Sequence, residues 1–416
     1  MSILIRQVLV NGKQQDIFIH DDRIDTIGVI KEKADIVIDG KGKALLPAFA
    51  NCHTHAAMTL FRSFGDDMEL FDWLQNRIWP VEAKLTPKDV YWATKLACVE
   101  MIKSGTTLFS DMYFHPQEIA QAASEMGIRV AIGEIFLDVL IHDTPTQREQ
   151  KIKHTMQEIA ALPLAIPTLC PHSIYTVNAE HLQWVAEQAK KNNWFMHMHL
   201  SETIKEVKDC ITLHKKRPVE YLSELDVLHP KLRLAHAVHI NDAEAALLAK
   251  NNVAIVHNPV SNMKLSVGKA LPYELYKKHN VRMTLGTDGC GSNNNLDMFE
   301  EMKIATLLQK FVTGKQTVMP AREIFDIATR NGFTAFGIDA GEIAVGKRAD
   351  LMLIDLKHPE FVPNHDLIAN AVYAANGNCV DTVICNGKIV MQDRKIPREE
   401  EIMEHVQKCA ERLFSD

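Results

Sequence analysis

The chain has 416 residues, of which 46% are hydrophobic and 24% are charged, and these ordinary globular fractions exclude a disordered, collagen-like or membrane-embedded protein. This length exceeds that of a usual single domain, so we expect either one large barrel with an accessory layer or two comparable domains. The 46 basic and 53 acidic residues give a formal net charge of -7 without long runs of one sign, which excludes nucleic-acid binding through a basic face.

The amino-terminal segment alternates apolar and polar residues and therefore predicts short strands joined by tight turns. It reads SILIRQVLVNG and then QQDIFIHDDRIDTIG, with Asn-Gly and Asp-Asp pairs between the apolar stretches. The first apolar stretch turns polar after about ten residues, too soon for a signal peptide or a transmembrane helix. We therefore expect a cytoplasmic protein that makes no membrane contact.

Residues 49–341 follow a different pattern, in which short apolar runs alternate with longer segments of helical periodicity. One such segment, residues 86–105, begins with a Thr-Pro cap and ends at a glycine. Eight candidate strands occur in order: ALLPAFANCHTH, TTLFSDM, IRVAIGEIF, LAIPTLCPH, WFMHMHLSE, LRLAHAVH, VAIVHNPVSN and VRMTLGTDG. Eight βα units favour a closed, TIM-like (β/α)8 barrel over an open doubly wound sheet, and no glycine-rich dinucleotide fingerprint follows the first strand.

The carboxyl-terminal segment returns to strand and turn chemistry. It contains AVGKRADLMLIDL and then CVDTVICNGKIVMQDRK, in which Asn386-Gly387 predicts a hairpin turn. We predict that residues 1–48 and 342–416 form one small composite β-sandwich domain with a C-terminal helix, and that residues 49–341 form the catalytic barrel.

Four side chains at the ends of predicted strands suit a metal site. His53 and His55 close the first strand and share one face because they are two residues apart, while His199 ends the fifth strand and Asp288 the eighth. In a closed barrel these strand ends meet at one rim. Three imidazoles and a carboxylate suit Zn²⁺ with water completing the shell, although Fe²⁺ or Mn²⁺ would accept the same ligands. An isolated His-x-His has little meaning, so the prediction depends on all four together.

The sequence MHMHL contains a second histidine with the same parity as His199. His199 lies nearer the rim, and Glu202 follows it by three residues, whereas His197 would lie one layer deeper in the barrel. We therefore predict that His199 is the ligand and that His197 is a hydrogen-bonded core residue.

A set of motifs runs almost the whole length of the chain: PAFANCHTHAAMTLFR, IWPVEAKLT, CPHSIYT, HMHLSET, LAHAVHI, VHNPVSNMKL and LGTDGCGSNNNLDMFEEM. They place His-x-His after the first strand, His-x-x-Glu after the fifth, His after the sixth and Asp after the eighth. This pattern resembles the mononuclear deaminase branch of the amidohydrolase superfamily. It is more closely similar to the S-adenosylhomocysteine/5′-methylthioadenosine deaminase group, which is related to the triazine hydrolases.

The resemblance implies a zinc-dependent hydrolytic deaminase that converts an adenosine-type nucleoside into the inosine-type product and ammonia. The implied zinc ligands are His53, His55, His199 and Asp288. The expected partner is a small purine nucleoside or related heterocycle, and we also expect a homo-oligomer.

The resemblance also implies roles for residues around the metal. Glu202 matches the catalytic acid/base, and His236 matches the histidine beside the reacting oxygen. Glu82 matches a residue that contacts the ribose hydroxyls, and His172 one that contacts substrate. Chemistry adds that Asp288 can accept a proton from the attacking water as well as bind the metal, and that Glu202 can carry protons to the ring and to the leaving amine.

Each of these residues has a structural alternative. Glu202 could be a solvated acid at the start of a helix, and Glu82 an exposed acid that begins a helix. His236 could be a hydrogen-bonded barrel residue, with His239 as its rival for the catalytic role. His172 could orient a ligand instead of contacting substrate.

One feature of this chain departs from the group's pattern. The group has arginines after the third strand that help to hold the nucleoside tail, whereas this chain has Glu134 at one such position and only Arg148 near the other. This weakens the case for S-adenosylhomocysteine, whose terminal carboxylate would bind a guanidinium. Adenosine-like substrates without the amino-acid tail become the more favoured candidates.

Several other activities remain as alternatives. The same site would suit a guanine-type deaminase or a triazine hydrolase, although Glu202 favours deamination because ammonia must be protonated to leave. A two-metal cyclic amidase usually has a bridging lysine after the fourth strand, and LAIPTLCPH has none. A noncatalytic metal-holding scaffold is the remote alternative.

Overall fold

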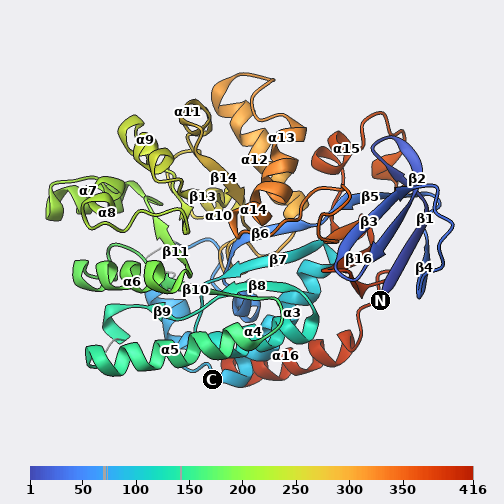
Figure 1. The fold of residues 1–416 in the computed structure, drawn as a ribbon. Coiled ribbons are helices and arrows are strands. Elements are labelled where there is room, and N and C mark those ends of the chain that lie inside the picture. The colour runs from blue at the N-terminus through green and yellow to red at the C-terminus, as the bar shows by residue number, and fades with distance from the viewer. Residues whose placement is uncertain (69–71, 73, 141–142, 416) are drawn as a thin grey trace.

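The computed structural model describes residues 1–68, 72, 74–140 and 143–415, which fold around two sheets (Figure 1). Strands of the barrel sheet follow the order β14-β13-β12-β11-β10-β8-β7-β6, and neighbours in this order pair in parallel. They are β6 (Phe49–Thr54), β7 (Thr106–Asp111), β8 (Arg129–Ile132), β10 (Ala165–Pro171), β11 (Phe195–Leu200), β12 (Leu232–His236), β13 (Ala254–His257) and β14 (Arg282–Leu285). All eight predicted strands are present.

The barrel is closed by hydrogen bonds between its first strand and the segment that follows its last one. The Asp288 amide donates to the His53 carbonyl at 3.0 Å, and the Thr287 amide donates to Asn51 Oδ1 at 3.0 Å. The predicted (β/α)8 barrel is confirmed, and its closure brings His53 and Asp288 next to each other.

The third predicted strand is the one that differs from its expected course. Instead of running through residues 128–136 it stops at β8 and resumes as the short β9 (Ile135–Phe136), which pairs with β10. The break falls at Gly133, where a Cβ atom would lie 1.9 Å from the Thr168 carbonyl oxygen. This close approach of two backbones requires glycine and interrupts the ladder.

Helices cover the outside of the barrel (Figure 1). The first long one, α3 (Pro87–Lys103), begins with the predicted Thr86-Pro87 cap, completed by a capping box with Asp89. The other helices of the barrel region are α2 (Trp79–Glu82), α4 (Pro116–Met126), α5 (Pro145–Ala161), α6 (Ala179–Asn192), α7 (Ile204–His214), α8 (Pro218–Glu224), α9 (Asp242–Lys250), α10 (Pro259–Lys264), α11 (Tyr273–His279), α12 (Met298–Thr313), α13 (Ala321–Asp326) and α14 (Gly332–Ala335).

A second, eight-stranded sheet combines both ends of the chain, in the order β17-β16-β15-β5-β1-β2-β3 with β4 beside β1. Its strands are β1 (Ser2–Val10), β2 (Lys13–His20), β3 (Arg23–Gly28), β4 (Ile36–Asp39), β5 (Lys43–Pro47), β15 (Leu351–Asp355), β16 (Val380–Cys385) and β17 (Lys388–Met391). The predicted hairpin joins β16 to β17, with left-handed φ values of 49° at Asn386 and 73° at Gly387. The segment between β15 and β16 holds the 3-10 turn η5 (Pro359–Phe361), the helix α15 (Leu367–Tyr373) and the 3-10 turn η6 (Gly377–Cys379).

A buried ion pair and a half-buried ring stack fix this sheet and the C-terminal helix against the barrel. Arg129 of β8 donates to Asp350 through Nη2 at 2.9 Å and Nε at 3.3 Å. Helix α16 (Glu399–Phe414) lies along α3, where the His405 ring stacks on Trp92 with ring centroids 3.9 Å apart. The bidentate ion pair and the ring stack hold both chain ends on the barrel framework.

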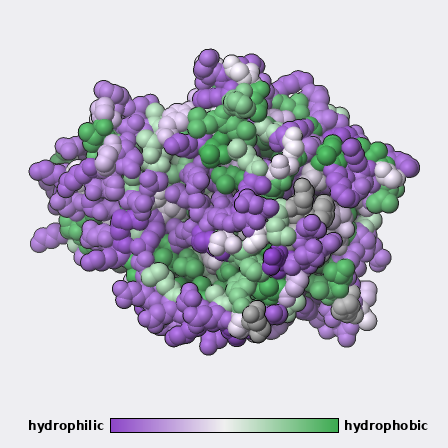
Figure 2. Space-filling model, turned by 180° about the vertical axis from the view of Figure 1, so that it is seen from behind, coloured by the Kyte–Doolittle hydropathy of each residue, from purple (hydrophilic) through white to green (hydrophobic). Residues whose placement is uncertain are grey.

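The molecular surface carries hydrophilic and hydrophobic regions. Seen from behind, hydrophilic side chains cover much of the face and hydrophobic side chains gather in separate patches (Figure 2). Across the described part of the chain, the helices are too short or too polar to span a bilayer.

Candidate active site

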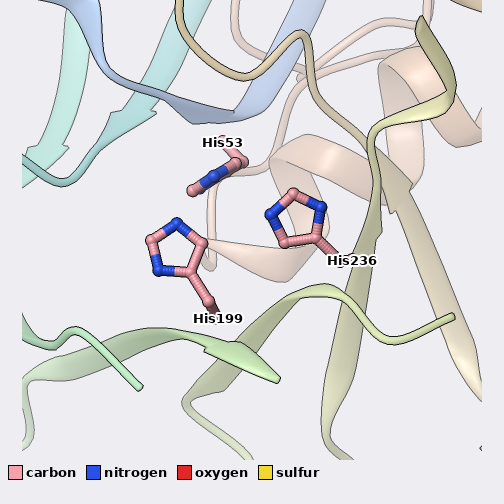
Figure 3. A group of neighbouring side chains, drawn as sticks. All are labelled: His53, His199 and His236. Atoms are coloured by element: carbon pink, nitrogen blue, oxygen red, sulfur yellow. The ribbon is translucent and has the colours of Figure 1, made fainter. Parts of the chain in front are cut away.

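Side chains from four barrel strands meet at the carboxyl ends of those strands. His53 lies one residue before the end of β6, His199 belongs to β11 and His236 ends β12, and the three imidazole rings point toward one another (Figure 3). One ligand atom from each of these histidines lies within 4.8 Å of the others, and His53, His55 and Asp288 form a second such group. The structure thus brings the four predicted ligands to one place, with His236 beside them.

The distances within this cluster match those between ligands of one metal ion. Asp288 Oδ1 lies 3.4 Å from His53 Nε2 and 3.3 Å from His55 Nε2, and His199 Nε2 lies 3.3 Å from His55 Nε2. Two ligands held about 2.0–2.2 Å from a tetrahedral Zn²⁺ lie roughly 3.3–3.6 Å apart. The buried Nε2 atom of His53 has no hydrogen-bond partner, so its lone pair is free for a metal. The residues present therefore fit a divalent ion.

The other ring nitrogen of each histidine is hydrogen-bonded. Nδ1 of His55 donates to the Met112 carbonyl at 2.7 Å, and Nδ1 of His199 donates to the His172 carbonyl at 2.9 Å. These acceptors place the proton on Nδ1 and leave Nε2 unprotonated for the metal.

His197, which lies deeper in the barrel, orients the ring of His53. Nδ1 of His53 lies 3.0 Å from Nε2 of His197, whose Nδ1 lies 2.9 Å from Ser110 Oγ. His197 is fully buried, and its hydrogen bonds within the barrel leave it no free nitrogen for the metal. The contacts from Ser110 through His197 fix the orientation of the His53 ring.

The protonation states within the cluster suit metal binding. Burial lowers the pKa of His53 to about 4 and holds that of His199 well below its usual value. Burial acts to raise the pKa of Asp288, but charge interactions with His53 and His55 outweigh it and hold the pKa well below its usual value. Both imidazoles are thus neutral and the carboxylate is ionised at neutral pH, as metal ligands must be.

Glu202 and His236 form an acid/base pair beside the cluster. Glu202 Oε2 lies 3.8 Å from His236 Nε2, and the Glu202 side chain is only 13% exposed. Burial raises the pKa of Glu202, so this carboxyl holds a proton more readily than an exposed glutamate. Burial acts to lower the pKa of His236, but the Glu202 and Asp288 carboxylates outweigh it and the net shift is upward. The side chains together can give and take protons at the cluster.

The backbone at two of these residues is strained. His236 has φ of 67° and Asp288 has φ of 65°, in the left-handed region that residues other than glycine seldom adopt. Such strain concentrates at functional sites, where the surrounding structure fixes the side-chain direction. His236 is held further by Nδ1, which lies 2.9 Å from Asn262 Oδ1.

The two residues expected to bind substrate, Glu82 and His172, have different neighbours. Glu82 ends α2 and accepts a hydrogen bond from the Tyr113 hydroxyl at 2.5 Å, and burial raises its pKa. The His172 ring lies next to that of His199, with centroids 4.7 Å apart, and its Nδ1 lies 3.0 Å from Thr176 Oγ1. His172 also orients His199 through its backbone carbonyl, and because its ring contacts Ser173 and Thr176 through Nδ1, its Nε2 atom can face a ligand.

Two supporting residues were missed as site residues by sequence reasoning. Ser261 Oγ donates to Asp288 Oδ2 at 2.6 Å. The Glu206 carboxylate accepts the amides of Ser201 at 2.8 Å and Glu202 at 2.9 Å, and burial raises its pKa to about 7. The only sequence signal for Glu206 was its place four residues after Glu202 on a helix, where acids are common.

We expect Glu206→Gln to lower kcat roughly 10- to 100-fold with little change in KM, because one of the two amides that hold the Glu202 segment would lose its acceptor. Steady-state kinetics together with the metal content of the purified variant would measure this. An unchanged kcat, or an equal loss of bound metal, would contradict a role in positioning Glu202.

A cluster of three imidazoles and one carboxylate at the carboxyl end of a (β/α)8 barrel, with a half-buried glutamate and a buried histidine beside it, is the arrangement of a metal-dependent hydrolase. The comparison with known families agrees. The chain belongs to the amidohydrolase family, whose model matches residues 44–390.

Curated relatives match the chain from end to end. The 5-methylthioadenosine/S-adenosylhomocysteine deaminase 1 of Archaeoglobus fulgidus is 47% identical over 412 residues, which cover 99% of this chain and 96% of the relative. The 5′-deoxyadenosine deaminase of Methanocaldococcus jannaschii is 42% identical over 422 residues, covering 99% of each.

Solved structures share the fold. An adenosine deaminase from Xanthomonas campestris with bound zinc is 30% identical, with a TM-score of 0.93 over 99% of this chain and 98% of that one. An atrazine chlorohydrolase from Arthrobacter aurescens complexed with zinc has a TM-score of 0.88 over 98% of this chain and 100% of that one, but at 20% identity it supports the fold alone.

Proposed function

We propose that this protein is a zinc-dependent deaminase that hydrolyses the ring amino group of adenosine-type nucleosides. The observation that carries the proposal is the convergence of His53, His55, His199 and Asp288 on one point with Glu202 beside it. Relatives named as deaminases of adenosine derivatives, and the zinc in the adenosine deaminase neighbour, support both the reaction and the metal.

His53, His55, His199 and Asp288 would hold the zinc. When bound, zinc lowers the pKa of a coordinated water toward ~7 and so supplies a nucleophile at neutral pH. Side chains of the protein would carry out the proton transfers. Glu202 delivers one proton of this water to the ring nitrogen and the other to the departing amine, so that water and the aminated ring become the oxo product and ammonia.

Neighbouring groups would hold the reacting atoms during these steps. His236 would donate a hydrogen bond to the oxygen that attacks the ring carbon. Asp288 would accept the second proton of the attacking water and pass it to Glu202 for the departing amine, while the Ser261 hydroxyl holds the Asp288 carboxylate through a hydrogen bond. Glu82 would bind the ribose hydroxyls and His172 the substrate. These roles rest on positions at the rim and on the matching motifs.

We further propose that the preferred substrates lack a charged amino-acid tail. Glu134 follows β8 at the rim and pairs with Lys151 at 3.0 Å, with its side chain 15% exposed. A carboxylate at this position cannot bind the carboxylate of S-adenosylhomocysteine as a guanidinium would. Several relatives at 40–44% identity are named 5′-deoxyadenosine deaminases, which supports a substrate with a small uncharged 5′ group.

In a panel of nucleosides, we expect kcat/KM for 5′-deoxyadenosine, adenosine and 5′-methylthioadenosine to exceed that for S-adenosylhomocysteine at least tenfold. Glu134→Arg should lower the ratio of kcat/KM between these uncharged nucleosides and S-adenosylhomocysteine by about tenfold, because a guanidinium contributes roughly 1.5–3 kcal/mol to binding a carboxylate. A coupled ammonia assay measures both. A wild-type preference for S-adenosylhomocysteine would contradict the proposed substrate class, and turnover of bare adenine at the nucleoside rate would contradict the ribose role of Glu82.

A further inference from the structure

A second group of metal-ligating side chains lies outside the barrel, in the segment between β15 and β16. His358 caps η5, Glu360 lies within η5 and Cys379 ends η6, so the three residues come from two turns on either side of α15. One ligand atom from each lies within 4.8 Å of the others. None of these residues takes part in the proposed deamination.

One oxygen of the Glu360 carboxylate has no hydrogen-bond partner among the described residues. This Oε2 atom is buried without a hydrogen bond, and His358 Nδ1 lies 3.8 Å away, too far to donate one. Oε1 receives only a long contact from the Asn376 amide at 3.5 Å. The barrel cluster has the same signature, an orphaned His53 Nε2 with a carboxylate oxygen 3.4 Å away. In both places an imidazole nitrogen and a carboxylate oxygen lie 3.4–3.8 Å apart, too far for a hydrogen bond but close enough for both to bind one ion.

The charges around the group balance a divalent cation. A Cys379 thiolate and the Glu360 carboxylate together neutralise two positive charges, and His358 adds a neutral donor. The nearby Arg394 guanidinium is occupied by carbonyl oxygens, those of Gly377 at 2.8 Å and Val380 at 2.7 Å. The Asp297 carboxylate, which accepts the Gly377 amide at 2.9 Å, partly offsets that positive charge.

We propose that His358, Glu360 and Cys379 bind a second metal ion of the zinc class. The sulfur ligand favours Zn²⁺, Co²⁺ or Cd²⁺ over Mg²⁺ or Ca²⁺. Cys379 is fully buried, whereas the side chains of His358 and Glu360 are 33% and 29% exposed, so the ion enters from solvent and a water completes its shell. Binding forms the sulfur–metal bond, releases the thiol proton to solvent and involves no redox change. The ion ties η5 to η6 and thereby fixes the loop between two strands of the terminal sheet.

Cobalt titration of the full-length protein tests this site separately from the barrel cluster. The four proposed ligands in the barrel are nitrogen and oxygen atoms, so a thiolate-to-Co²⁺ charge-transfer band reports only a sulfur site. We expect wild-type protein to retain two metal equivalents after gel filtration and to show this band. Cys379→Ser should retain one equivalent, lose the band and keep deaminase turnover within about twofold of wild type.

Cys210→Ser is the matched control, since Cys210 is also buried but lies on α7 away from this group, and it should keep both equivalents and the band. His358→Ala, at a partly exposed position, provides a second route if Cys379→Ser does not fold, and it too should lose the band. A single equivalent in the wild type, or a band that persists in Cys379→Ser, would overturn the proposal. Neither outcome would affect the proposed deaminase.

Discussion

Glu202→Gln is expected to lower kcat by about 10² to 10⁴-fold while the bound zinc remains, because the amide keeps the size of the side chain but cannot carry a proton. The carboxyl lies 3.8 Å from His236 and close to the cluster, and burial raises its pKa, so it can hold the proton that the ring nitrogen needs. Ammonia release and metal content, measured on the same preparation, test this expectation.

The matched control for this variant is Glu187→Gln, an exposed position on α6, which should behave as wild type. Turnover in Glu202→Gln close to the wild-type value would exclude the proposed proton shuttle. If the variant loses zinc together with activity, Glu202 supports the metal site. The lower kcat would then reflect the missing metal and would not test proton transfer.

The strands of the barrel could be predicted because buried parallel strands read as short, continuous apolar runs. The candidate cluster followed from the same fact, since residues at the ends of parallel strands converge whatever their distance in sequence. His53 and Asp288 are more than two hundred residues apart, yet closure of the barrel joins them through one backbone hydrogen bond. Residue type and position at a strand end were enough to select them.

Features that depend on tertiary contacts could not be predicted. Gly133 interrupts its strand because the Thr168 carbonyl of the neighbouring strand lies where a side chain would go. The sequence around Gly133 gives no sign of this contact with a residue 35 positions away. Glu206 acts through backbone amides of Ser201 and Glu202, which have no residue-specific signature. His358 and Cys379 come together only because two turns fold toward each other around α15.

Removal of the metal is the second change for which we expect a near-complete loss of turnover. A strong chelator should abolish activity and added Zn²⁺ should restore it, since water that is not bound to a metal has a pKa of about 15.7 and supplies almost no hydroxide at neutral pH. His199→Ala should lower metal affinity and kcat/KM by more than about 10²-fold, whereas His197→Gln, which disturbs only the residue behind His53, should cost about 10- to 100-fold in metal affinity. Metal analysis and ammonia release measure both variants.

If the chain binds two metal ions, a chelator removes both, and the loss of activity could then come from either site. The chelation experiment should therefore be done with Cys379→Ser as well as with the wild type. Loss and recovery of activity with a single zinc equivalent in that background would assign catalysis to the barrel cluster. The exposed His154→Ala, whose side chain is 73% accessible, serves as the control for histidine loss. Full turnover by metal-free protein would contradict the proposed chemistry, because neutral water at a buried imidazole cluster is too weak a nucleophile to displace an aromatic amine.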